Sequence, residues 1–200
     1  KYRQIDKYIE ILGGLIQPDK AWRIADMGAG KGYLTFALYD YLAGKKIDAK
    51  VTGVEYRKDL VDLCNGIAKK SGFGGLNFVQ GTIENFDASG MNAFIALHAC
   101  DTATDDAIAK GVKAGADLIV VAPCCHKQIR PQMQLPPLLK PMLQHGVHLG
   151  QQAEMVTDSL RALLLEANGY DAQVFEFVAL EHTSKNKMIL AVRRPAGARV

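Results

Sequence analysis

Cysteine, histidine and acidic side chains gather in two short segments of this chain. Residues 97–105 read LHACDTATD, and residues 123–127 read PCCHK. Imidazoles titrate near neutral pH, thiolates are nucleophiles, and both side chains bind metals, so these residue types suit proton transfer, covalent catalysis or metal binding. The candidate catalytic residues are His98, Asp101, Cys124, Cys125 and His126.

A glycine-rich turn is the third feature with chemical potential. Residues 26–32 read DMGAGKG and end a short apolar run. Glycines allow a left-handed backbone and a close approach to a ligand. The nicotinamide fingerprint fails because Tyr33 occupies its third glycine position, and the P-loop fails because Gly32 follows Lys31. Glu55 ends the next predicted strand, where a carboxylate can accept two hydrogen bonds from a ribose diol.

A repeated alternation of strand and helix must position these segments. The apolar patterns predict a helix within residues 1–14, then strands at 22–27, 51–55, 76–79, 94–97 and 116–122 with helices between them, then a helix at 156–167 and strands at 174–180 and 188–192. This alternation predicts a parallel sheet with helices on both faces, and the short connection makes the last two strands antiparallel neighbours. Ligands of such sheets bind at the carboxyl ends of the strands, so all three motifs share one cleft.

The turn DMGAGKG followed by Glu55 resembles the nucleoside-binding signature of class I S-adenosylmethionine-dependent methyltransferases, over residues 20–194. The resemblance implies an α/β, Rossmann-like sheet of seven strands with the last two antiparallel. It also implies an enzyme that uses S-adenosylmethionine and releases S-adenosylhomocysteine. Gly28 and Gly30 would face the amino-acid end of the cofactor, Asp26 would lie near its amino group, and Glu55 would hold its ribose. The cofactor-binding residues implied in this way are Asp26, Gly28, Ala29, Gly30, Glu55, Tyr56, Thr82, Ile83 and His98.

The two cysteine–histidine segments together resemble a narrower subgroup of methyltransferase domains. This subgroup includes the methyltransferase-like part of glutathione-S-transferase-C-terminal-domain-containing proteins. The opening KYRQ and residues 185–187, which read KNK, are similar to its pattern. The resemblance names no acceptor for the methyl group.

Simple methyl transfer is one chemistry open to these residues. Because the sulfonium of the cofactor is already reactive, the protein mainly aligns the acceptor with the methyl group. It also removes a proton from an oxygen or nitrogen acceptor. His98, Asp101 and His126 are the candidates for that base.

Three other interpretations compete for the cysteines. Cys100, with Cys124 or Cys125, stands where RNA 5-methylcytosine methyltransferases place the cysteines that attack a pyrimidine ring, although only Pro123 supplies the usual flanking proline. A metal site would use soft ligands of both segments, but the C-x-x-C spacing is missing, so we assign no metal. The cysteines also suit a structural role as small buried hydrophobes.

A basic, proline-rich insert follows the fifth predicted strand at residues 127–150, and its broken pattern predicts a loop with short helical pieces. From Leu118 to Ala153 there is no Asp or Glu, while the stretch holds Lys127, Arg130, Lys140, His145 and His148. A positive field beside a methyl donor attracts phosphate. The CCH run at 124–126 is also loosely similar to that of some methyltransferases that act on transfer RNA, so RNA is the favoured acceptor, with no signal for DNA specificity. A solvated loop is the alternative for this segment. For the whole chain the alternatives are a non-catalytic binding module or a nicotinamide-dependent oxidoreductase.

The length and composition of the chain are ordinary for a globular domain. At 200 residues the chain predicts one domain, 1–200, with a frayed tail at 196–200. Its 48% hydrophobic and 22% charged residues exclude a disordered chain, and no apolar run reaches the roughly 18 residues of a membrane span. Four cysteines in a chain of this length do not form a disulfide framework. We therefore expect a reducing compartment, the cytoplasm.

Overall fold

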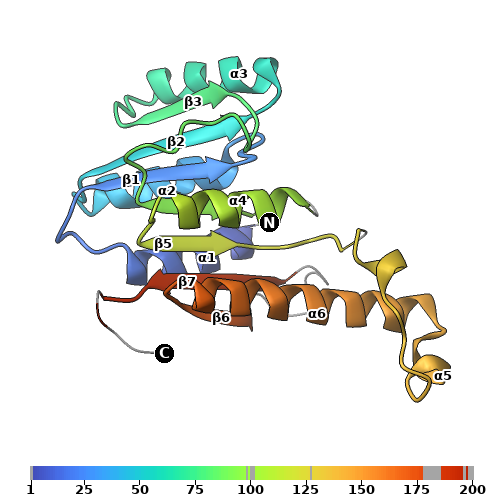
Figure 1. Cartoon of the computed structure of the whole chain (residues 1–200). Helices are drawn as coiled ribbons and strands as arrows, with labels where there is room; N and C mark the ends of the chain where they lie inside the picture. Colours follow the sequence, from blue (N-terminus) through green and yellow to red (C-terminus); the bar gives the residue numbers. More distant parts are fainter. Residues whose placement is uncertain are drawn as a thin grey trace.

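The structure is a computed structural model, and it describes residues 2–97, 99, 102–126, 128–177, 186–195 and 197. Strands and helices alternate along the first part of the chain, as Figure 1 shows. The strands are β1 (Trp22–Met27), β2 (Ala49–Glu55), β3 (Leu76–Gln80), β4 (Ala93–Ala96), β5 (Leu118–Val121), β6 (Tyr170–Glu176) and β7 (Lys187–Arg193). The helices are α1 (Tyr2–Leu15), α2 (Tyr33–Gly44), α3 (Lys58–Lys70), α4 (Thr102–Lys113), α5 (Lys140–Leu143) and α6 (Gly146–Ala167), with a 3-10 turn η1 (Arg130–Gln132).

The strands form a single seven-stranded sheet in the order β3-β2-β1-β4-β5-β7-β6. Strands β1 to β5 are parallel to their neighbours, whereas β7 runs antiparallel to both β5 and β6. The predicted α/β class and the antiparallel ending are therefore confirmed. The strand order reverses at β1, because β2 lies on one side of it and β4 on the other, and such a switch point is where open α/β sheets bind ligands.

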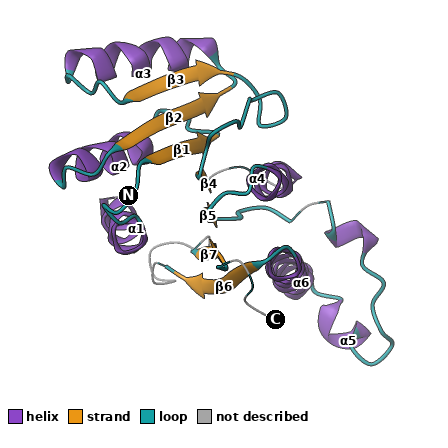
Figure 2. Ribbon diagram, turned by 60° about the vertical axis from the view of Figure 1, so that its left-hand side comes forward, coloured by secondary structure: helices purple, strands orange, loops and turns teal. Residues whose placement is uncertain are grey.

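The sheet is covered on both faces, because its central strands are apolar on both sides. In β1, Trp22 and Ile24 join the core beneath α1, α2 and α3, while Ala25 and Met27 join the core beneath α4 and α6. This alternation follows from the two-residue period of a strand. Figure 2 shows the two groups of helices on opposite sides of the sheet. Trp22 is buried in the first of these cores, and its indole nitrogen donates to the Gln17 carbonyl at 2.8 Å.

The segment after β5 departs in part from the sequence prediction. Its start forms η1 and the four-residue α5, as a proline-broken loop should. However, α6 begins at Gly146, ten residues before Val156, where the apolar period becomes regular. Strand β6 likewise begins four residues earlier than predicted, at Tyr170, because Gly169 turns the chain with φ +87° directly after α6. Tyr170 is buried, and its hydroxyl donates to the Ala116 carbonyl at 2.8 Å.

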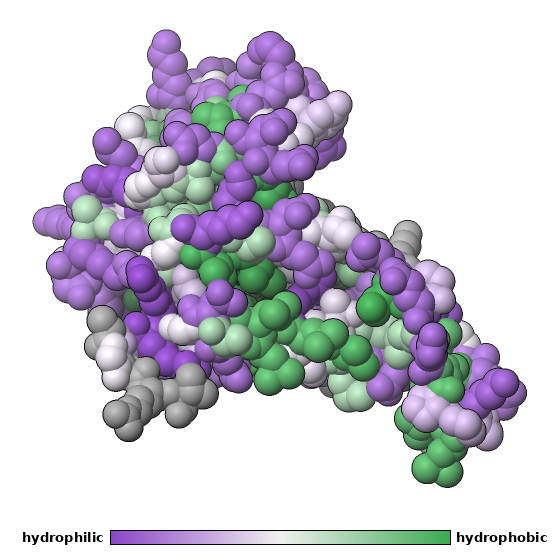
Figure 3. Space-filling view, viewed as in Figure 1, coloured by the Kyte–Doolittle hydropathy of each residue, from purple (hydrophilic) through white to green (hydrophobic). Residues whose placement is uncertain are grey.

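Helix α6 exposes apolar side chains and buries charged ones, the reverse of what its apolar pattern predicts. The apolar stripe that predicts this helix lies at the surface, where Leu160, Leu163 and Leu164 are 50%, 59% and 61% exposed. Its buried face includes Asp158 and Arg161, which form an ion pair at 3.2 Å. Figure 3 shows apolar atoms gathered along this part of the surface. Among the described residues, no helix combines the length and apolar character that a membrane crossing needs.

Candidate functional site

The glycine turn joins β1 to α2 at the switch point of the sheet. Gly28, Gly30 and Gly32 all have positive φ angles, of 75°, 59° and 69°. The amides of Gly28 and Ala29 donate to the carbonyl of Val54 at 2.9 and 3.0 Å, so the turn is fastened to the end of β2. These bonds hold the turn at the carboxyl edge of the sheet, where Figure 1 shows the arrowheads of the parallel strands.

The first and last glycines of the turn serve different purposes. A Cβ added at Gly32 would lie 2.8 Å from the ring of Phe78, so packing requires this glycine. A Cβ added at Gly28 would meet nothing within 4 Å, so the chain leaves open space over this end of the turn. Such space is what a backbone needs when a ligand must approach it closely.

Replacing Gly28 with alanine is expected to remove cofactor affinity without unfolding the chain. The new methyl group would enter the open space and weaken S-adenosylhomocysteine binding by more than about tenfold, while the left-handed backbone costs about 1 kcal/mol of stability. Gly72→Ala is the matched control, because Gly72 has φ +70° and open space but lies at the end of α3. Calorimetry should separate the two variants, whereas equal affinities would show that Gly28 does not border the cofactor.

Glu55 lies against the glycine turn, as its position in the sequence predicts. It is nearly buried at the end of β2, and its Oε2 accepts the amide hydrogen of Gly30 at 2.8 Å. Its Oε1 accepts from the backbone amide of Arg57 at 3.1 Å and from Arg57 Nε at 2.9 Å. Burial alone would raise the pKa of Glu55, but the hydrogen bonds from Arg57 and Gly30 outweigh it and hold the pKa below its usual value.

Arg57 would compete with a ribose for the Glu55 carboxylate. The guanidinium of Arg57 is more than half exposed and occupies part of the hydrogen-bonding capacity that a ribose diol would use. An ionised carboxylate accepts about four hydrogen bonds, and three are already made. The role of Glu55 as the ribose ligand stays a prediction, and it requires the Arg57 side chain to move aside.

Asp26 lies beneath the turn rather than on its surface. Its carboxylate is 5% exposed and accepts a hydrogen bond from Thr35 Oγ1 of α2 at 2.6 Å. Burial raises the pKa of Asp26 to about 6, against the opposing effect of the Thr35 hydrogen bond. Burial and the nearby Asp26 also raise the pKa of Tyr8 on α1. The predicted contact of Asp26 with the amino group of the cofactor stays a prediction, and the observed carboxylate faces the helix layer.

The residues predicted to border the adenine lie at the ends of β2 and β3. The side chain of Tyr56 is 72% exposed, so its ring is available to a base. Thr82 and Ile83 are half-buried, Ile83 packs against the second core, and Thr82 Oγ1 accepts from the amide of Asn85 at 3.2 Å. Cys64, which lies close by on α3, is fully buried, and burial raises the pKa of its thiol.

Residues 123–126, the described part of the PCCHK segment, follow the end of β5 at the same edge of the sheet. Cys124 and Cys125 are half-buried, and their sulfur atoms lie 3.7 Å apart. His126 follows them and is half-buried. The other predicted catalytic and insert residues of this region lie outside the described residues: His98, Cys100, Asp101 and Lys127.

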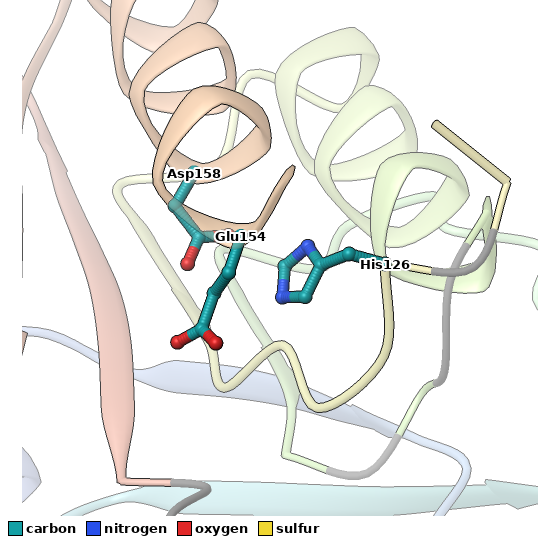
Figure 4. Close-up of side chains that lie close together, drawn as sticks. All are labelled: His126, Glu154 and Asp158. Atoms are coloured by element: carbon teal, nitrogen blue, oxygen red, sulfur yellow. The ribbon is translucent and has the colours of Figure 1, made fainter. Parts of the chain in front are cut away.

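Two acidic residues that the sequence prediction missed lie beside His126. Glu154 and Asp158 stand one turn apart on α6, and one ligand atom from each lies within 4.8 Å of a ring nitrogen of His126 and of the other. Figure 4 shows the imidazole directed at both carboxylates. Burial raises the pKa of Asp158, although His126 and Arg161 oppose this effect. The four-residue spacing of Glu154 and Asp158 could have indicated that both acids share one face of a helix. The sequence prediction instead took the apolar stripe of this helix as its buried face.

Two cations hold these acids in place. Arg161 Nη1 donates to Asp158 Oδ1 at 3.2 Å, and its Nε and Nη2 bind the carboxylate of Asp105 on α4 at 2.7 and 3.1 Å. Lys187 Nζ, at the start of β7, lies 2.9 Å from Glu154 Oε1. The acids of α6 are therefore tied to α4 and β7, so α6 is fixed relative to the loop that carries His126.

The described site residues form two walls at the carboxyl edge of the sheet. The glycine turn with Glu55 and Tyr56 forms one wall, and residues 123–126 with α6 form the other. In Figure 3 the surface is notched between the part that carries β2 and β3 and the arm that carries α5 and the start of α6. A donor on the first wall and an acceptor on the second would meet in this notch.

Comparisons with solved structures identify the fold. A SAM-dependent methyltransferase from Aquifex aeolicus is similar with a TM-score of 0.53 and 11% identity, covering 92% of this chain and 87% of that one. A putative S-adenosyl-L-methionine-dependent methyltransferase from Methanococcus maripaludis is similar with a TM-score of 0.57 and 12% identity, covering 98% and 88%. At these identities the likeness establishes the fold alone, which is that of class I methyltransferases.

Sequence comparison identifies the family. The human glutathione S-transferase C-terminal domain-containing protein is 26% identical over 217 residues, and the bovine one is 25% identical over the same length. Each match covers 96% of this chain but only 33% of the relative, so the chain spans about a third of the length of the curated relatives it matches. The family described as "Methyltransferase domain" matches residues 1–132, about two thirds of the chain, and this chain belongs to that family of methyltransferase domains.

Proposed function

We propose that this chain transfers the methyl group of S-adenosylmethionine to RNA. The family and the fold imply S-adenosylmethionine as the cofactor. The residues present fit it: open space lies over Gly28, an ionised carboxylate of Glu55 adjoins the turn, and the Tyr56 ring is exposed. Family membership leaves no support for the nicotinamide alternative.

The chemistry divides between the cofactor and the chain. When bound, S-adenosylmethionine supplies a methyl group on a positively charged sulfur. The chain must then hold the donor in the glycine turn, align an acceptor with the methyl group, and accept the proton that an oxygen or nitrogen acceptor releases. Among the described residues, His126 is the proposed proton acceptor, because it follows β5 into the cleft and has two carboxylates beside it that would stabilise its protonated form.

The basic insert carries the proposal that the acceptor is RNA. Arg130, Lys140, His145 and His148 are exposed on the arm that holds η1, α5 and the start of α6. No acidic residue lies between Leu118 and Ala153 to offset them. A polyanion lying along this arm would release counterions and bind with a strong salt dependence.

Methyl transfer with radiolabelled cofactor onto total cellular RNA and protein tests the proposal. Label that resists protease and is lost with RNase is the expected result. The double variant Arg130→Glu/Lys140→Glu should weaken RNA binding by about tenfold or more and flatten its dependence on salt between about 50 and about 200 mM. Lys69→Glu/Lys70→Glu is the matched control, because these exposed lysines end α3 at the far side of the sheet.

Each contrary result would reject a different part of the proposed function. Label that appears only in protein or in small molecules would reject RNA while keeping methyl transfer. Calorimetric binding of S-adenosylhomocysteine without any labelled product would favour a non-catalytic binding module. Equal RNA affinity of the two double variants would remove the insert from the interface.

A further inference from the structure

The cluster of His126, Glu154 and Asp158 has a chemical capacity beyond proton transfer. A ring nitrogen of His126 and one carboxylate oxygen from each acid lie within 4.8 Å of one another. Glu154 and Asp158 share one face of α6 because they are four residues apart. His126 comes from a different part of the chain, the loop after β5, and Figure 4 shows its ring directed at the two acids.

Each acid pairs one carboxylate oxygen with a cation. Asp158 Oδ1 accepts from Arg161, and Glu154 Oε1 pairs with Lys187. Asp158 is 2% exposed, and its Oδ2 is buried without a hydrogen-bond donor among the described residues. A buried carboxylate oxygen without a donor is costly, so a proton or a cation is needed to satisfy it.

The surrounding bonds match those found behind metal ligands. A metal-binding carboxylate is usually oriented by a hydrogen bond to its second oxygen, as Arg161 orients Asp158. Arg161 is itself fixed by its two bonds to Asp105. Since these contacts hold Asp158 in place with Oδ2 buried, the carboxylate is arranged before any ion arrives.

We propose that His126, Glu154 and Asp158 bind a divalent transition-metal cation on the acceptor side of the cleft. One imidazole and two carboxylates suit Zn²⁺ or Mn²⁺ better than Ca²⁺ or Mg²⁺, which prefer oxygen ligands alone. Three protein ligands leave coordination positions open for water or an oxygen of the acceptor. This site differs from the cysteine-rich one considered from the sequence, because its carboxylates come from α6. Binding of the ion does not depend on which acceptor is methylated, and His126 acts as the proton acceptor only while the ion is absent, because the proton and the metal compete for its ring.

Metal binding can be tested on the chain alone. After treatment with a chelator, the chain is titrated with Zn²⁺ by calorimetry and with Mn²⁺ by electron paramagnetic resonance, with Mg²⁺ and Ca²⁺ as further arms. We expect one Zn²⁺ or Mn²⁺ ion per chain. His126→Ala and Glu154→Gln should each weaken binding by about tenfold or more. Glu154→Gln guards against a folding defect, because Glu154 is only half-buried and far-ultraviolet circular dichroism can verify that the variant is folded.

Two controls separate this site from its neighbours. His145 and His148 lie with their rings 5.7 Å apart, so His148→Ala tests whether these exposed imidazoles bind the ion instead. Co²⁺ reports on the thiols, because ligation by Cys124 or Cys125 would give an intense near-ultraviolet charge-transfer band. The proposal is overturned by any of three results: no stoichiometric binding at about 1 mM Zn²⁺ or Mn²⁺, binding that survives both site variants, or a thiolate band.

Discussion

Replacing Glu55 with alanine should weaken S-adenosylhomocysteine binding by about a hundredfold. The carboxylate is ionised at neutral pH and adjoins the glycine turn, where it would accept both hydroxyl groups of the ribose. Hydrogen bonds to a charged group contribute about 1.5 to 3 kcal/mol each, so losing two costs roughly 3 kcal/mol or more, which corresponds to about a hundredfold in affinity. Isothermal titration calorimetry at one pH and ionic strength measures this directly.

Two further variants separate ribose binding from a distorted turn. Glu55→Gln keeps an acceptor for the Gly30 amide but replaces the second oxygen with a donor, so it should also lose most of the affinity. Arg57→Ala removes the side chain that competes for Oε1 and should leave affinity unchanged or improve it. If Glu55→Ala and Glu55→Gln both bind like the original chain, the ribose is held elsewhere. Asp62→Ala, which removes an exposed acid of α3, is the control.

Replacing Asp26 with asparagine should flatten the dependence of stability on pH. The pKa of Asp26 is raised from 3.8 to about 6 in the folded chain, so between these values the folded state holds a proton that the unfolded state has released. The folded state therefore loses stability as the pH rises through this window. From about pH 4.5 to about pH 7.5 the loss due to this group is about 2 kcal/mol. The amide of the Asp26→Asn variant is neutral throughout, and its oxygen can still accept the Thr35 hydrogen bond.

Urea unfolding curves at several pH values provide the measurement. The gap between Asp26→Asn and the original chain should widen by about 2 kcal/mol in favour of the variant toward neutral pH. Asp62→Asn controls for the removal of a carboxylate at the surface. Parallel stability curves for Asp26→Asn and the original chain would mean that the buried carboxylate is not destabilised by its surroundings.

Local patterns predicted most of the fold and the position of Glu55 beside the glycine turn. The apolar run from Trp22 to Met27 predicted a strand, and in the structure its side chains divide between the two cores. Three glycines within five positions predicted a tight turn, because glycine adopts left-handed backbone conformations most readily, and all three have positive φ in the structure. Glu55 was found because it directly ends a strand, so its place followed from that of β2.

The acceptor half could not be predicted in the same way, because it depends on contacts between distant segments. The pattern of Leu160, Leu163 and Leu164 correctly predicted a helix but not which face is buried. In that orientation Arg161 is buried and pairs with Asp105, which is 56 positions away in the sequence. The approach of Glu154 and Asp158 to His126 follows from this orientation, so no local pattern could reveal it.

The distribution of the two walls along the chain has an evolutionary consequence. The residues implied in donor binding that the structure describes all precede residue 84, whereas His126, the insert and the acids of α6 all follow residue 122. The sheet is the rigid frame between them. Under the proposed function, substitutions in the later half would alter what is methylated while the earlier half continues to bind the same donor. Descendants of one ancestral domain could in this way diverge toward new targets by changing fewer than 40 consecutive positions, about 123 to 158, without rebuilding the nucleoside pocket.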